Sequence, residues 1–121
     1  MPSRARVDAF VSVVEQGKFV DALEQFYTHD ASMQENNDPP RKGLALLIEG
    51  ERKVMATYEG ARAHHVGPVF IDGDYVVINW VFEFPLPDRR VIRLEELAHQ
   101  RWSGDKVVEE RFFYDPKQMR V

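Results

Sequence analysis

Three adjacent polar residues, Gln34, Glu35 and Asn36, end a short run in which small or apolar residues alternate with polar ones. This alternation predicts a β-strand over residues 31–36 that stops before Pro39 and Pro40. Two interpretations of Glu35 are open: the strand simply ends in polar residues at the surface, or a carboxylate points into a cavity. A carboxylate in an apolar cavity is a workable acid or base near neutral pH, because burial disfavours its charged form.

The histidines and glycines supply no further catalytic motif. His64 and His65 are neighbours in a predicted strand, so at most one of them can point into a cavity, and His65 is our candidate to donate a proton there. The sequence contains no cysteine, no H-x-H or HExxH pattern, no G-x-S-x-G elbow and no phosphate-binding glycine loop. We therefore expect neither a metal site nor a cofactor.

Composition places the chain among ordinary globular proteins. Its 121 residues are 44% hydrophobic and 30% charged, which suits a single domain over residues 1–121. Sixteen Lys and Arg are interspersed with twenty Asp and Glu, and the net charge of −4 gives no surface for nucleic acid. The sequence lacks the apolar stretch of a signal peptide and any apolar run near the roughly 20 residues that span a membrane. We expect a cytoplasmic protein that binds neither nucleic acid nor membrane.

The elements that must position these residues follow from the spacing of apolar residues. Helical spacing predicts two helices within residues 3–27, with a turn at Gly17, and a third helix over residues 44–58. Alternating patterns joined by short turns predict antiparallel strands over residues 61–71, 75–84, 90–102 and 106–114. The order α-α-β-α-β-β-β-β indicates an α+β fold, in which the helices cover one face of a curved antiparallel sheet.

The order and spacing of several strings resemble the nuclear transport factor 2-like superfamily, especially its SnoaL-like branch. The strings are "GKF", "FYTHDASMQEN", the "KG" that opens the third helix, the "DGD" hairpin and the closing "WSGDKVVEERFFY". The resemblance covers nearly the whole chain and implies a cone-shaped α+β barrel, with a bent sheet wrapped around the helices and an internal pocket. Members include isomerases, cyclases, epoxide hydrolases, dehydratases and binding modules, so the fold does not define a function.

Comparison with the ketosteroid isomerase site places that family's general base on Glu35. The oxyanion-binding tyrosine of that site falls on Phe10 and its protonated aspartic acid on Ala98, so both hydrogen-bond donors are missing. Because an enolate needs such donors, we do not expect steroid isomerisation by that mechanism. Epoxide hydrolysis, which needs an Asp-Arg-Asp arrangement inside the cavity, ranks last because the predicted inward faces hold no arginine.

Two further acids join Glu35 on the predicted inward faces. The resemblance assigns Glu96 to the inner face of residues 90–102, and alternation on the last strand turns Glu110 inward as well. These acids either line a pocket and act on a ligand, or are neutralised by a neighbour such as Arg101 or Arg111, or are solvated because the register is shifted by one.

We expect a pocket for a small, apolar, ring-containing molecule that carries a carbonyl or hydroxyl group. If the protein is an enzyme, it would be a cofactor-independent isomerase, cyclase or dehydratase, in which Glu35 removes a proton and Glu110 or His65 donates one. The predicted ligand-binding residues are Phe10, Tyr27, Met33, Trp80, Phe82, Glu96, Phe112 and Tyr114. The alternative is a non-catalytic dimeric module that binds a ligand or another protein, with structural acids.

The predicted outer face of the sheet favours a homodimer. Val77, Val81, Leu97 and Phe113 interrupt the polar residues of this face with more apolar area than contact with water favours. The resemblance implies that a second copy of the chain covers them.

Overall fold

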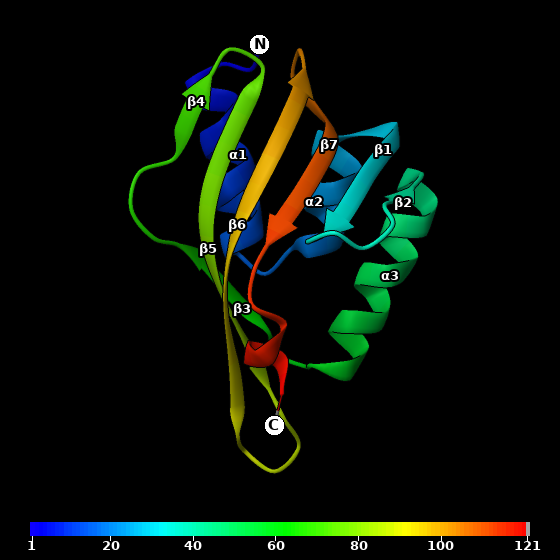
Figure 1. The fold of residues 1–121 in the computed structure, drawn as a ribbon, viewed down its shortest axis with the longest axis vertical. Coiled ribbons are helices and arrows are strands. Elements are labelled where there is room, and N and C mark those ends of the chain that lie inside the picture. The colour runs from blue at the N-terminus through cyan, green and yellow to red at the C-terminus, as the bar shows by residue number, and fades with distance from the viewer. Residues whose placement is uncertain (121) are drawn as a thin grey trace.

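The computed structural model describes residues 1–120, and in it three helices lie against one face of a curved, seven-stranded sheet (Figure 1). The helices are α1 (Arg4–Glu15), α2 (Phe19–Phe26) and α3 (Leu44–Thr57). The strands are β1 (Tyr27–Glu35), β2 (Arg41–Lys42), β3 (Arg62–His65), β4 (Phe70–Asp72), β5 (Tyr75–Pro85), β6 (Val91–Ser103) and β7 (Lys106–Phe113), followed by the short 3-10 helix η1 (Pro116–Met119). No helix within residues 1–120 combines the length and the apolar character needed to cross a membrane.

The sheet is mixed and does not close on itself. Its strand order is β2-β1-β7-β6-β5-β3, and β4 also pairs with β5. The predicted antiparallel hairpins from β3 and β4 to β5, from β5 to β6 and from β6 to β7 are confirmed, but β1 runs parallel to β7. The alternation of side chains predicts that β1 is a strand but does not fix its direction relative to β7, because no tight turn links the two strands.

Three boundaries differ from the predicted ones. Residues 61–71 form two strands and not one, because Gly67, with φ of 73°, and Pro68, which has no backbone donor, interrupt the ladder. β1 begins at Tyr27, directly after α2. β2 is an additional two-residue strand, which pairs with Ser32 and Met33 of β1.

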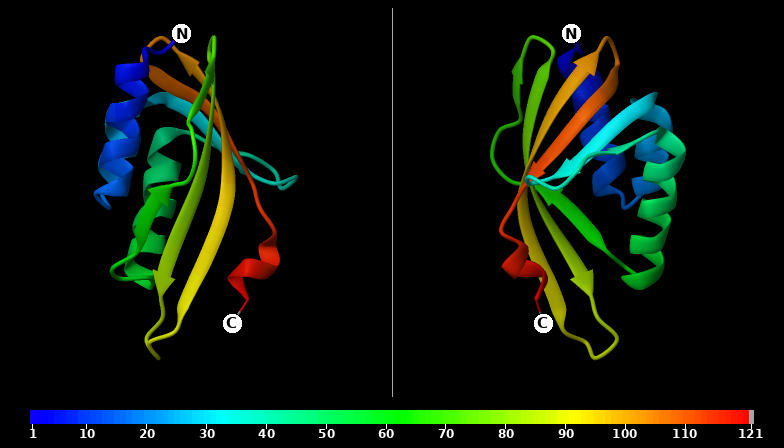
Figure 2. Two further views of the ribbon diagram at one scale, coloured as in Figure 1. Left: turned by 90° about the vertical axis from the view of Figure 1, so that its left-hand side faces the viewer. Right: turned by 45° about the vertical axis from the view of Figure 1, so that its right-hand side comes forward.

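The side chains on the inner face are those that the alternation predicts. On β6, residues of even number from Ile92 to Trp102 are buried, while Arg93, Glu95, Leu97 and His99 are exposed. Figure 2 shows the helices stacked on the concave side of the sheet. Ala98 and Trp102 of β6 belong to the same core cluster as buried residues of α1, α2 and α3. A strand that alternates in this way has one possible register relative to the core, and on β6 this register buries Glu96.

One member of the apolar set predicted for the outer face is not exposed. Leu97 and Phe113 are 45% and 42% exposed and lie directly opposite each other on β6 and β7. Val81 is completely buried within the single chain. It therefore contributes nothing to an exposed patch, and the apolar centre of this face is the pair Leu97 and Phe113.

Candidate functional site

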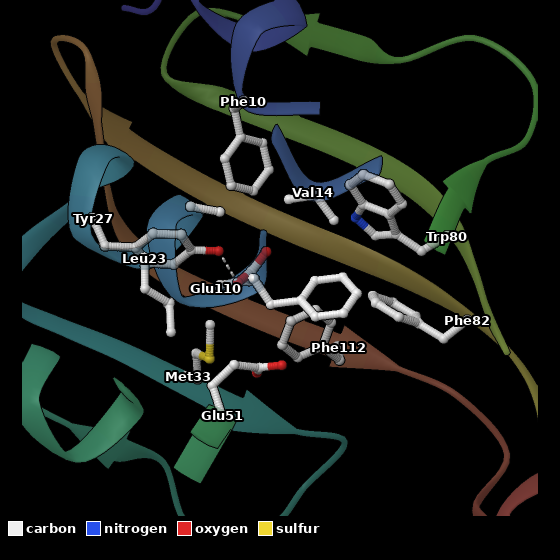
Figure 3. Close-up of a pocket in the computed structure, with 12 residues that line it drawn as sticks. Phe10, Val14, Leu23, Tyr27, Met33, Glu51, Trp80, Phe82, Glu110 and Phe112 are labelled. Carbon is white, nitrogen blue, oxygen red and sulfur yellow. Dashed lines mark hydrogen bonds between the residues drawn. The ribbon is translucent and has the colours of Figure 1, made fainter. Parts of the chain in front are cut away.

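A cavity with two adjoining lobes lies between the inner face of the sheet and the helices. The outer lobe has a volume of about 220 Å³ and the inner lobe about 70 Å³. The two lobes share Phe19, Met33, Glu51, Phe82 and Phe112 in their walls, so they form one cavity. Figure 3 shows the inner lobe, where side chains from helices and strands converge. Ligand pockets usually have roughly 300 to 1,000 Å³, so this cavity lies at the lower limit of that range and suits only a small molecule.

The wall of the inner lobe contains a buried carboxyl group, Glu110 of β7, which two donors hold in place. The Tyr27 hydroxyl donates to Glu110 Oε1 (Figure 3), and Gln100 Nε2 donates to Glu110 Oε2 at 2.6 Å. Burial raises the pKa of Glu110 to about 7, although both hydrogen bonds lower it. Burial, followed by the neighbouring Glu110, raises the pKa of Tyr27 well above 10, so its hydroxyl stays a neutral donor. Glu110 is therefore a fixed group that exchanges a proton near neutral pH.

Gln100 connects Glu110 to Trp102 inside the core. The indole Nε1 of Trp102 can only donate, and it donates to Gln100 Oε1 at 2.9 Å. The amide of Gln100 must then present its Nε2 to Glu110. Because Gln100 is completely buried, no solvent competes for these bonds. Trp102 thus determines which end of the amide faces the carboxyl group.

The outer lobe contains a second buried acid, Glu96 of β6. It is 8% exposed, and no group within residues 1–120 hydrogen-bonds to its carboxyl oxygens. Burial, followed by the charges of Glu110 and Glu35, raises the pKa of Glu96 to about 8. The group is mainly protonated at pH 7, and it lines open volume, so it is available to donate a proton to a bound molecule.

An ion pair and a further acid line the same lobe. Arg41 Nη2 of β2 lies 2.7 Å from Glu35 Oε2 of β1, and both side chains are partly exposed. Glu51 of α3 lines both lobes. Burial raises the pKa of Glu51, and the positive charge of Arg41 opposes this shift. The outer lobe therefore contains three carboxyl groups and one guanidinium group.

The polar run that ends β1 has two separate roles. Glu35 lines the outer lobe, whereas Asn36 ends the strand with a φ of 49°, a left-handed conformation that asparagine tolerates. The Asn36 side-chain oxygen accepts a hydrogen bond from Tyr114 N, and its carbonyl accepts one from Arg111 Nε, both at 2.9 Å. These bonds fasten the end of β1 to the end of β7. They hold Glu35 and Tyr114 at one wall of the outer lobe.

The residues predicted to contact a ligand all line the cavity. Phe10, Tyr27 and Trp80 line the inner lobe, Glu96 and Tyr114 line the outer lobe, and Met33, Phe82 and Phe112 line both. Of the residues predicted to be catalytic, Glu110 lines the inner lobe and Glu35 the outer lobe. Their contact with a ligand stays a prediction.

The structure does not bring His65 to the cavity. β3 packs beside α1, and His65 Nδ1 lies 2.8 Å from Glu15 Oε2 of that helix. Within residues 1–120, no cluster of three or more histidine and acidic side chains is arranged to hold a metal ion.

Two polar residues of the outer lobe were missed by sequence reasoning. Arg41 was missed because it follows two prolines in a segment without a predicted element. It lines the outer lobe, so the expectation that no arginine reaches the cavity is wrong. Glu51 could have been found, because it lies four residues after Leu47 and three before Val54 on the face of α3 that lines the cavity.

The geometry suits proton transfer inside an apolar chamber. Glu96 and Glu110 lie on adjacent strands, have pKa values near neutral pH and face aromatic side chains. Groups with such pKa values can both accept and donate a proton at the pH of the cell.

Comparisons with known proteins bear on this site. The sequence matches the SnoaL-like domain family over residues 7–110. No curated protein matches it significantly.

Solved structures with the same fold have low sequence identity to this chain. A protein of unknown function with a cystatin-like fold from Xanthomonas campestris is 17% identical, with a TM-score of 0.80 over 98% of this chain and 95% of its own. A proposed SnoaL-like polyketide cyclase from Mesorhizobium loti is 19% identical, with a TM-score of 0.75 over 91% and 97%. A protein with a ketosteroid isomerase-like fold from Catenulispora acidiphila, solved in complex with trimethylamine, is 14% identical, with a TM-score of 0.78 over 96% and 89%.

Proposed function

The chain belongs to the SnoaL-like domain family, and we propose that its cavity binds a small, ring-containing molecule and exchanges a proton with it. The observation that carries the proposal is the pair of buried acids Glu96 and Glu110 on one cavity wall, with pKa values of about 8 and 7. A general acid or base is most effective when its pKa lies near the working pH. Chemistry of this kind is that of a cofactor-independent isomerase, cyclase or dehydratase.

The two acids have different roles in this proposal. Glu110, held by Tyr27 and Gln100, is ionised in a large part of the molecules at pH 7 to 8 and acts as the base. Glu96 keeps its proton at pH 7 and donates it to a carbonyl or hydroxyl oxygen. The ring of the ligand packs against Phe82 and Phe112, whose side chains face both lobes. The protein thereby stabilises negative charge that develops on the ligand oxygen.

Glu35 has an orienting role in this proposal. The Arg41 guanidinium donates a hydrogen bond to one of the two carboxylate oxygens of Glu35. The ion pair therefore presents a fixed arrangement of charge to a polar group of the ligand. A guanidinium and carboxylate pair can position a ligand through several directed hydrogen bonds.

A second candidate reaction is the hydrolysis of an epoxide. Arg41 lies at the cavity beside Glu35, and its charge also acts on Glu51, which gives a carboxylate, guanidinium and carboxylate arrangement. One carboxylate would activate water, and the protonated Glu96 would donate a proton to the epoxide oxygen. Formation of a diol from cyclohexene oxide, lost in Arg41→Met and in Glu96→Gln, would favour this reaction over the first.

Hydrogen exchange of cyclic ketones tests the leading proposal without knowledge of the natural substrate. Cyclopentanone and cyclohexanone in D₂O are incubated with the protein, and NMR measures the loss of their α-protons. We expect catalysed exchange that is lost in Glu110→Gln and reduced in Glu96→Gln. Glu95→Gln, which removes a carboxylate from the opposite face of β6, is the matched control and should keep the activity.

The alternative of a non-catalytic, dimeric binding module makes the opposite prediction. This alternative would be favoured if the ketones bind in the cavity but their α-protons exchange no faster than in D₂O without the protein. Dimerisation itself is compatible with both functions, and we propose that two copies meet on the outer face of the sheet around Leu97 and Phe113.

A further inference from the structure

We infer that the outer lobe selects an organic cation, such as a quaternary ammonium group or a protonated amine, over neutral and anionic groups of the same shape. The inference rests on the proposed function in taking the cavity as the ligand site, and it adds the charge of the ligand. Three features carry it: an excess of carboxyl groups, a buried acid without a partner, and a wall of aromatic rings.

Carboxyl groups outnumber cationic side chains around the outer lobe. Glu35, Glu51 and Glu96 line it, and Arg41 is the one cationic side chain among the lining residues of the described chain. Arg41 is already paired with Glu35. Glu110 adds a further carboxyl group in the adjoining inner lobe. An anionic ligand would find no unpaired cationic group among these lining residues, whereas a cation would meet carboxyl groups that can ionise beside it.

Glu96 is the group that a cation would satisfy. The residue is 8% exposed, its side chain faces the outer lobe, and no group within residues 1–120 hydrogen-bonds to its carboxyl oxygens. A buried acid without a partner holds its proton, and a positive charge placed beside it allows it to ionise. The titratable and charged groups that share its surroundings are Glu35 on β1, Arg41 on β2, Glu51 on α3, Glu110 on β7, and the hydroxyl groups of Tyr58 and Tyr114.

Aromatic rings of β5 line the cavity on the same face of the sheet as Glu96, whose direct neighbour on the paired strand is Trp80. Along β5 the ring centroids of Trp80 and Phe82 are 5.9 Å apart, and those of Phe82 and Phe84 are also 5.9 Å apart with planes that differ by 2°. Tyr58 continues the row, 5.0 Å from Phe84. Ring faces attract ammonium groups most strongly where water is excluded. The lobe therefore combines aromatic surface with acids that can supply a counter-charge.

A pair of probes with the same shape isolates the effect of charge. Choline and 3,3-dimethylbutan-1-ol differ in the positive nitrogen of choline, which a carbon atom replaces. In calorimetric titrations at pH 7.5, we expect choline to bind about tenfold or more tightly than the alcohol. Choline has no proton to lose at this pH, so a heat of binding that depends on the buffer's ionisation enthalpy would report protons released by the protein.

The variant Glu96→Gln separates this acid from the rest of the cavity. We expect it to reduce both the preference for choline and the release of protons, because the amide cannot ionise. Glu95→Gln, on the same strand but on the outer face, should leave both unchanged.

Equal affinity for the two probes would overturn the inference while leaving the cavity as a binding site. A failure of both probes to bind would overturn it as well, and the ketone exchange experiment would then test the proposed function independently. Charge selectivity that persists undiminished in Glu96→Gln, without proton release in either protein, would overturn the assignment to Glu96.

Discussion

Replacing Glu96 by Gln should make the folded protein more stable above neutral pH and change little at pH 5. Glu96 is buried without a hydrogen-bond partner, and its pKa is about 8 in the folded protein against an ordinary value of 4.5. Between these values the folded state binds a proton that the unfolded state has lost. Stability therefore falls as the pH rises through this window, and it falls by about 1.4 kcal/mol per pH unit for one group.

The expected size of the effect follows from these pKa values. Between pH 5 and pH 7.5 the wild type should lose about 3 kcal/mol of unfolding free energy through Glu96 alone, a loss that Glu96→Gln escapes. For a domain of this length the gain corresponds to a midpoint of thermal unfolding higher by about 10 °C at pH 7.5. Gln is nearly isosteric with Glu, so packing contributes little to the difference.

Urea denaturation at pH 5, 6, 7 and 8 would measure the effect. All samples should have the same protein concentration, because self-association adds to the apparent stability. Glu95→Gln is the control for removal of an exposed carboxylate from the same strand. A stability difference between Glu96→Gln and the wild type that does not change from pH 5 to pH 8 would refute the reasoning.

Three further variants test other parts of the structure. Tyr27→Phe removes a hydrogen bond that lowers the pKa of Glu110, so an NMR titration should show that carboxyl group titrating at higher pH, with a loss of about 1 to 2 kcal/mol in urea denaturation. Trp102→Phe removes the indole donor that fixes the Gln100 amide, so the amide can rotate and we expect the pKa of Glu110 to change, although Trp102 does not contact Glu110 through a hydrogen bond. An unchanged pKa of Glu110 would show that Trp102 contributes packing alone. Leu97→Glu combined with Phe113→Glu should convert a dimer to a monomer in sedimentation equilibrium, and a wild type that is monomeric at micromolar concentration would contradict the proposed interface.

The sequence was informative wherever one periodicity controlled the structure. Alternation divided β6 and β7 into two faces each and turned Glu110 inward, and the family resemblance identified the face of β6 that carries Glu96 as the inner one. The parallel pairing of β1 with β7 could not be foreseen, since contacts distant in sequence determine it. Arg41 was missed for the same reason: a two-residue strand after prolines has no periodic signal.

Hydrogen-bonded networks were also beyond the reach of the sequence. The alternation of side chains shows that Gln100 and Trp102 face the same side of β6. It does not show that Trp102 donates a hydrogen bond to Gln100, or that Gln100 donates one to Glu110. His65 illustrates the opposite case. It was a reasonable inward histidine, but the packing of β3 against α1 pairs it with Glu15.

The central claim is that two buried acids at this cavity titrate near neutral pH and not near their ordinary value. Carboxyl ¹³C NMR of the ligand-free protein, with Glu96→Gln and Glu110→Gln to assign the signals, measures this most directly. We predict that the carboxyl groups of Glu110 and Glu96 titrate with pKa values of about 7 and 8. Titration of both groups near their ordinary value of 4.5 would contradict the claim.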